Sequence, residues 1–88
     1  MRIEVLPIGS VIRNKRVISL LESQIPAGIE IGIRKIDSGG QHVENYRLYT
    51  RMNEGKDWDE ERLIISRIRS SDGRIREYAI RGTIYISQ

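Results

Sequence analysis

Hydrophobic and polar residues alternate one by one in two neighbouring segments, and this alternation predicts a pair of strands. In segment 28–37 isoleucines occupy positions 29, 31 and 33, and in segment 42–52 apolar residues and one threonine recur at every second position from 46 to 52. The sequence DSGG at 37–40 contains residues that favour turns. We therefore predict an antiparallel hairpin. One face of its second strand should carry Tyr46, Leu48, Thr50 and Met52.

The N-terminal part of the chain predicts one strand and one helix. Residues 2–6 alternate apolar and charged side chains and end at Pro7, which cannot donate a backbone hydrogen bond. In segment 14–26, Asn14 is a favourable N-cap and apolar residues recur at helical spacing until a proline. A strand is the alternative for this segment, because several of its apolar residues are β-branched.

Residues 58–69 fit either a helix that begins after Asp57 or a strand that begins at Arg62. An acidic residue three positions after Asp57 completes a capping pattern, which supports the helix. The run of β-branched residues and the turn-like sequence SSDG that follows it support the strand. We favour the strand, because it pairs across that turn with the next segment.

The hairpin closed by SSDG could have an even loop of two or four residues, with Arg69 opposite Arg76 or Arg74, or a loop of three residues. A three-residue loop with Gly73 as a bulge would flip one strand relative to the other, whereas an even loop sorts the residues into two coherent faces. We therefore predict an even loop. The expected core face is then Ile64, Ile68, Ile75 and Ala79. The expected outer face is Arg67, Arg69, Arg74, Arg76 and Tyr78, together with Leu63, Ile65 and Ile80.

These elements, with a last short strand expected over 83–87, predict a small α+β fold. One N-terminal helix would pack against a twisted antiparallel sheet of four to six strands, either open or partly closed into a barrel. We expect one domain, residues 1–88. A chain of this size buries only about 60 to 65% of its unfolded surface, so self-association is a natural supplement to its core.

Composition argues against most catalytic chemistry. The chain has no cysteine, which excludes thiolate sites. It has a single histidine, His42, so zinc binding is disfavoured as well. The alternating Asp57, Asp59 and Glu61 lack the other positions of a calcium loop. We expect a protein that is not an enzyme and needs no metal, cofactor or small-molecule substrate. No apolar run suits a membrane span or a signal peptide, so we expect a cytoplasmic protein.

Charge is distributed unevenly along the chain. The formal net charge is +3 and the sequence pI is about 9.6. Residues 62–88 contain six basic and two acidic residues, whereas residues 54–61 contain one and five. Twelve of the fifteen basic residues are arginine, and thermolabile residue types are scarce, a balance typical of thermophilic proteins. Any basic surface should therefore lie in the C-terminal third.

Arginines and tyrosines in two of the predicted strands point to nucleic acid as a partner. Guanidinium groups bind phosphates bidentately, and tyrosine rings give bases a surface to stack on. The alternative is that these arginines only form ion pairs on a solvated face, since no fingerprint of a known binding module accompanies them. The candidate DNA-binding or RNA-binding residues are Arg47, Tyr49, Arg51, Arg67, Arg69, Arg74, Arg76 and Tyr78.

Three apolar residues on the expected outer face indicate an interface. Leu63, Ile65 and Ile80 would lie among arginines, which is unfavourable for a monomer and suggests a homodimer or another protein partner. Packing of the helix against these residues is the alternative. Trp58 in the acidic loop either lies at the edge of the core, which we favour, or is exposed and available to bind a partner.

Overall fold

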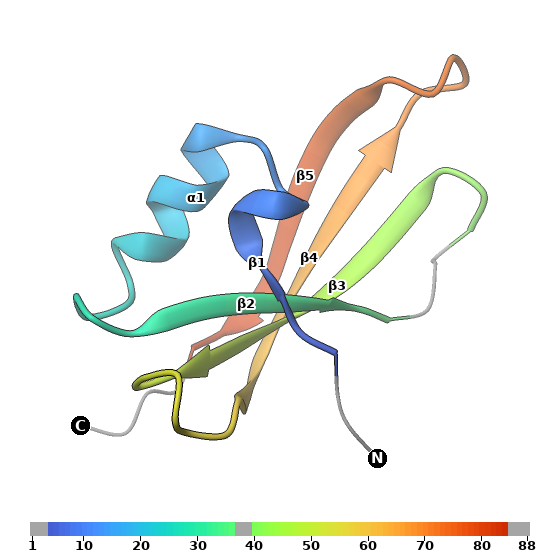
Figure 1. Ribbon diagram of the computed structural model, residues 1–88. Helices are drawn as coiled ribbons and strands as arrows, with labels where there is room; N and C mark the ends of the chain where they lie inside the picture. Colours follow the sequence, from blue (N-terminus) through green and yellow to red (C-terminus); the bar gives the residue numbers. More distant parts are fainter. Residues whose placement is uncertain (1–3, 37–39, 85–88) are drawn as a thin grey trace.

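The computed structural model describes residues 4–36 and 40–84. It contains one open, five-stranded antiparallel sheet in the order β1-β2-β3-β4-β5, one α-helix and a 3-10 turn, which confirms the predicted small α+β class (Figure 1). Within these residues no helix is long and apolar enough to cross a membrane. The elements are β1 Leu6–Pro7, η1 Ile8–Ser10, α1 Lys15–Glu22, β2 Glu30–Lys35, β3 Val43–Arg51, β4 Asp59–Arg69 and β5 Ile75–Thr83.

The predicted helix is confirmed, and its start is capped as expected. The Asn14 side chain accepts hydrogen bonds from the backbone N–H groups of Arg16 and Val17, at 3.0 and 3.1 Å. These bonds satisfy donors that have no partner inside the helix. The helix ends at Glu22, before the expected boundary at Pro26, because the following residues form turns.

We expect Asn14→Ala to lower the free energy of unfolding by about 1 kcal/mol, since the cap bonds are lost. Asn14→Asp keeps an acceptor at the same place and should stay close to the parent protein. Urea denaturation followed by circular dichroism measures both. Equal stability of Asn14→Ala and the parent would show that the cap contributes nothing.

One face of the sheet is covered by α1 and η1, and we call it the core-side face. The predicted positions of Tyr46, Leu48 and Thr50 on one face are confirmed, with 5%, 0% and 4% exposure, whereas Met52 lies beyond β3 and is exposed. We call the opposite side the open face, because no helix of residues 4–36 and 40–84 packs there. The buried apolar cluster is Ile8, Ile12, Leu21, Ile25, Ile33, Tyr46, Leu48, Leu63 and Ile65.

The core face predicted for the C-terminal hairpin is wrong. Leu63 and Ile65 are buried, with 1% and 0% exposure, and Ile80 packs against the same cluster. Apolar residues occupy both faces of β4, so alternation alone does not reveal which face the helix covers. Three of the residues expected in the core, Ile64, Ile68 and Ala79, lie on the open face. The fourth, Ile75, is opposite Arg69 on the core-side face but is 44% exposed.

The even loop is also wrong. The Ser70 N–H donates to the Arg74 carbonyl at 2.8 Å, which closes a three-residue loop, and Gly73 adopts φ 87°. Arg69 is then opposite Ile75, but the next pair is Ile68 with Glu77. Arg76 is therefore an extra residue in β5, which forms a β-bulge. The odd loop exchanges the two faces of β5 relative to β4, and the bulge exchanges them back. The predicted sorting into two faces survives along the rest of the hairpin.

Three strand boundaries differ from expectation. β4 begins at Asp59 rather than Arg62, and the helix alternative for this segment is wrong. Pro7 lies inside β1 opposite Gly32, which an edge strand tolerates because one side of its backbone needs no partner. β5 continues through Gly82 to Thr83, so no separate strand begins there. The predicted strand and turn residues 2–3, 37–39 and 85–87 lie outside the described ranges.

Candidate nucleic-acid interface

The residues predicted to bind nucleic acid do not share one surface. Arg47, Tyr49 and Arg51 of β3 point to the open face, because they alternate with the buried residues of that strand. Arg67 of β4 is opposite Tyr78 of β5, and both lie on the core-side face. The two sets are therefore separated by the sheet.

Arg67 is held by partners within the protein. Its Nε and Nη2 donate to the two carboxylate oxygens of Glu44 at 3.1 and 3.0 Å, and Nη2 also donates to the Tyr46 hydroxyl at 2.9 Å. Its Nη1 donates to the Val11 carbonyl at 2.9 Å. Only 12% of the Arg67 side chain is exposed. This guanidinium joins the segment before α1 to the sheet, which is a structural role.

Glu44 binds a second arginine as well. The Arg69 Nε donates to Glu44 Oε1 at 2.9 Å, while its Nη1 donates to the Gly73 carbonyl at 2.8 Å. The hydrogen bonds from Arg67, assisted by those from Arg69 and opposed by burial, lower the pKa of Glu44 from 4.5 to about 2. We call Glu44, Tyr46, Arg67 and Arg69 the Glu44 cluster. Sequence reasoning missed Glu44, although its place opposite Arg67 in the β3–β4 pairing would have revealed it.

The remaining predicted residues of the C-terminal hairpin are dispersed. Arg74 is exposed in the turn, with its Nε 3.7 Å from Asp72, and Arg76 is exposed at the bulge. Tyr78 is half-buried against the core. None of the three adjoins the open-face residues of β3.

The apolar residues assigned to an interface belong to the core. Leu63 and Ile65 are buried beneath α1 and η1, and Ile80 is half-buried beside them. The alternative in which the helix packs on these residues is therefore confirmed. The prediction that they form an exposed patch among arginines is wrong.

The aromatic residues of the open face are already in contact with the protein. Tyr49 is 4% exposed. The Arg51 guanidinium lies 4.1 Å from the centre of the Trp58 ring and is also hydrogen-bonded to Glu30. The tip of the Trp58 ring lies against Gly32, which fits the expected place of this ring at the edge of a packed region. Tyr49 is therefore too buried to stack on a base, and Arg51 already lies over the Trp58 ring.

A row of residues crosses the open face from β2 to β5. Arg34 is opposite Arg47, Arg47 is opposite Ile64, and Ile64 is opposite Arg81. Arg62 lies two positions from Ile64 on the same strand and shares this face. Sequence reasoning missed Arg34, Arg62 and Arg81 as a group, because only the registers of three successive strand pairs bring them together.

Three arginines of this face are exposed and have no acidic partner among the described residues. We call Arg34, Arg62 and Arg81 the open-face arginines. Arg47 differs, because its Nε lies 3.1 Å from Glu60 Oε1 and its Nη1 donates to the Glu61 carbonyl. The open-face arginines therefore carry positive charge that this part of the chain does not neutralise.

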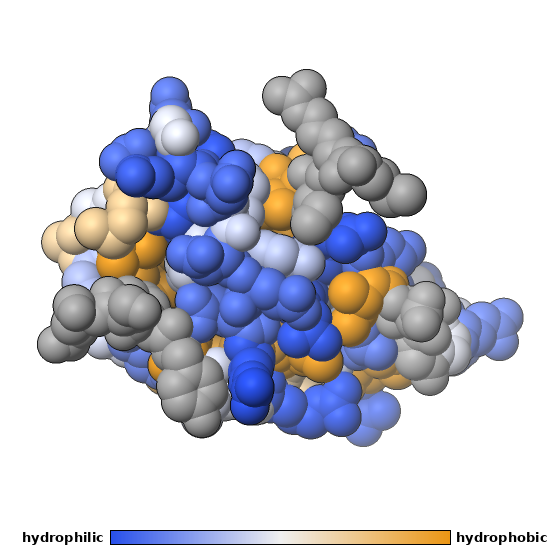
Figure 2. Space-filling view, turned by 90° about the horizontal axis from the view of Figure 1, so that it is seen from below, coloured by the Kyte–Doolittle hydropathy of each residue, from blue (hydrophilic) through white to orange (hydrophobic). Residues whose placement is uncertain are grey.

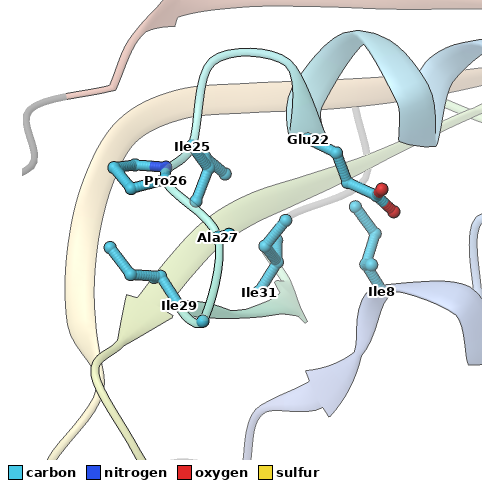
Figure 3. Close-up of a pocket in the computed structure, with 8 residues that line it drawn as sticks. Ile8, Glu22, Ile25, Pro26, Ala27, Ile29 and Ile31 are labelled. Carbon is cyan, nitrogen blue, oxygen red and sulfur yellow. The ribbon is translucent and has the colours of Figure 1, made fainter.

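Other surfaces of the protein offer less chemistry. A cavity of about 450 Å³ lies between the end of α1 and β2, and Figure 3 shows isoleucine side chains and Pro26 around it, with Glu22 as its one ionisable residue. Among the described residues no group of three side chains could hold a metal ion. Figure 2 shows that the side seen from below is mainly hydrophilic, with separate hydrophobic areas.

Comparisons with protein families, with curated proteins and with solved structures find no match to this chain. The surface of the protein is therefore the guide to its function.

Proposed function

We propose that this protein binds nucleic acid through the open face of its sheet. The observation that carries the proposal is the placement of Arg34, Arg62 and Arg81 on one exposed face, without acidic partners in the described chain. The guanidinium group matches the geometry of a phosphate and stays charged at physiological pH. The protein acts as a non-catalytic binding module.

The spacing of these arginines suits a phosphate backbone. Arg34 and Arg81 are separated by three strand spacings, roughly 14 Å, which is similar to the width of the DNA major groove, about 12 Å. Because Tyr49 is buried and Arg51 lies over the Trp58 ring, the described residues offer little surface for base stacking on this face. We therefore propose contacts to phosphate and sugar with little sequence preference.

The double variant Arg34→Ala with Arg62→Ala tests the proposal. We expect it to weaken binding to a 20-base-pair duplex by at least about tenfold, and to reduce the slope of log affinity against log salt by about 2. Fluorescence anisotropy between 50 and 200 mM salt measures both quantities. A single-stranded probe of the same length shows whether duplex geometry is required.

The matched control is Arg13→Ala with Arg16→Ala. Both residues are exposed and lie beside or on α1, away from the open face, and the control has the same net charge as the test variant. It should bind within about threefold of the parent if position matters more than total charge. Equal losses in the two double variants, or no salt-dependent binding by the parent, would contradict the proposal.

A homodimeric interaction or regulatory module without a nucleic-acid role is the second candidate function. The observation that favours it is apolar area on the open face, where Ile64, Ile68 and Ala79 are partly exposed. A parent protein that self-associates but shows no affinity for either probe would select this candidate.

A further inference from the structure

The outer edge of β5 is a strand edge that no described strand pairs with. β5 has nine residues and pairs with β4 on one side, and no strand of the described residues pairs with its other side. Such an edge presents unpaired backbone N–H and C=O groups, and proteins usually protect it with proline, lysine or a very short strand. β5 has neither proline nor lysine, and its bulge at Arg76 lies close to its start.

The opposite edge of the sheet differs in this respect. β1 is only two residues long and contains Pro7, so it offers little backbone to a partner. Edge protection is therefore stronger at β1 than at β5, where only charged side chains and the bulge at Arg76 oppose pairing. This asymmetry indicates that another strand pairs with the outer edge of β5.

We infer that a second copy of this chain pairs with β5 in antiparallel orientation, about a two-fold axis at Ala79. The charges of β5 are self-complementary in this register, because Arg81 is placed opposite Glu77 of the partner subunit. The symmetry of the dimer repeats this pair on the other side of the axis. Both residues are exposed, and neither has an ion-pair partner within the described part of its own chain.

The other side chains agree with this register. Ala79 meets the partner's Ala79 at the axis, where two small residues fit closely. On the core-side face, Tyr78 is opposite Ile80 of the partner subunit, an aromatic and β-branched pair that stabilises strand pairing. A shift of two residues would place Arg81 opposite an apolar residue or leave Glu77 opposite an uncharged one, so the charge pairs select one register.

The dimer would continue one sheet through both subunits. In an antiparallel pair, opposite residues lie on the same face, so the two open faces would form one surface with Arg34 and Arg62 contributed by each subunit. An edge contact buries less area than a standard interface, and we expect a Kd on the order of 10 μM. In the dimer Arg81 pairs with Glu77 of the partner subunit, which leaves Arg34 and Arg62 for phosphate. The inference does not rest on nucleic-acid binding, and its test contains no nucleic acid.

A charge exchange tests the pairing. Glu77→Arg alone and Arg81→Glu alone each place like charges opposite one another twice, and each should raise the dimer Kd at least tenfold in sedimentation equilibrium. The double variant Glu77→Arg with Arg81→Glu restores opposite charges and should return to within about threefold of the parent. A parent that stays monomeric up to 500 μM, or a double variant as weak as the single ones, would overturn the inference.

The absence of native cysteine allows a direct test of the register. Opposite Cα atoms in an antiparallel pair lie about 4.5 or 5.5 Å apart, within the range that a disulfide spans. Ala79→Cys should therefore form a disulfide-linked dimer on mild oxidation. Thr83→Cys is the control, because the proposed register places its two copies far apart. Equal cross-linking of both variants would contradict the register.

Discussion

Gly82→Ala should lower the free energy of unfolding by at least about 4 kcal/mol, a large part of the 5 to 15 kcal/mol typical of a folded domain. A Cβ at this position would overlap the Arg62 carbonyl oxygen and would lie 2.9 Å from the Arg62 carbonyl carbon and 3.0 Å from the Leu63 Cα. Gly82 also has φ 105°, which L-residues rarely adopt. Both obstacles involve backbone, so side-chain rotation cannot relieve them.

Gly28→Ala separates the two effects. Gly28 has φ 90°, but a Cβ there would meet no atom within 4 Å. Gly28→Ala should therefore lower the free energy of unfolding by only about 1 kcal/mol, the cost of the backbone conformation alone. Urea denaturation of the two variants measures the difference, which reports how closely β4 and β5 approach each other at Gly82. Equal losses in both variants would show that this close approach is absent.

The second large effect concerns the Glu44 cluster. Glu44→Gln should destabilise the protein at pH 7 by roughly 3 kcal/mol, because Arg67 loses its charged partner while its side chain is only 12% exposed. Glu54→Gln, in the exposed loop after β3, is the matched control and should change stability by less than about 0.5 kcal/mol. Denaturant unfolding at fixed salt compares the two variants.

The same cluster predicts how stability depends on pH. The pKa of Glu44 is lowered to about 2 in the folded protein from 4.5, so the unfolded chain takes up its proton first as the pH falls. Its contribution is complete above about pH 5, decreases below pH 4.5 and is lost near pH 2. The stability difference between the parent and Glu44→Gln should therefore narrow from pH 5 to pH 2. A constant difference across this range would show that the charge of Glu44 contributes nothing.

The pattern of the sequence predicts the strands well because alternation is a local property. The hairpin of β2 and β3 is an example, since Ile31 and Ile33 share one face of β2 and Tyr46 and Leu48 share one face of β3. In β4, Leu63 and Ile65 alternate with Ile64 and Ile68, so both faces are apolar and the packing of α1 decides which is buried. That decision depends on tertiary contacts, and the sequence pattern alone does not contain it.

The candidate site was less predictable for the same reason. Arg67 and Arg62 look alike in the sequence, but Arg67 meets Glu44 across the β3–β4 pairing and Arg62 meets no acidic partner in the described residues. Glu44 lies 23 positions from Arg67. The loop at Gly73 and the bulge at Arg76 also offset each other, so neither is evident from the alternation alone. Strand registers are required to divide the arginines into structural and available groups.

The central claim is that the open-face arginines contact phosphate while the arginines of the Glu44 cluster do not. The direct measurement is the chemical shift of each arginine Nε–H group in NMR spectra of the labelled protein, recorded while a DNA duplex is added. We expect the signals of Arg34 and Arg62, which stay without an acidic partner in the proposed dimer, to shift with increasing duplex, and those of Arg67 and Arg69 to stay in place. Shifts confined to Arg67 and Arg69, or to Arg13 and Arg16 beside α1, would contradict it.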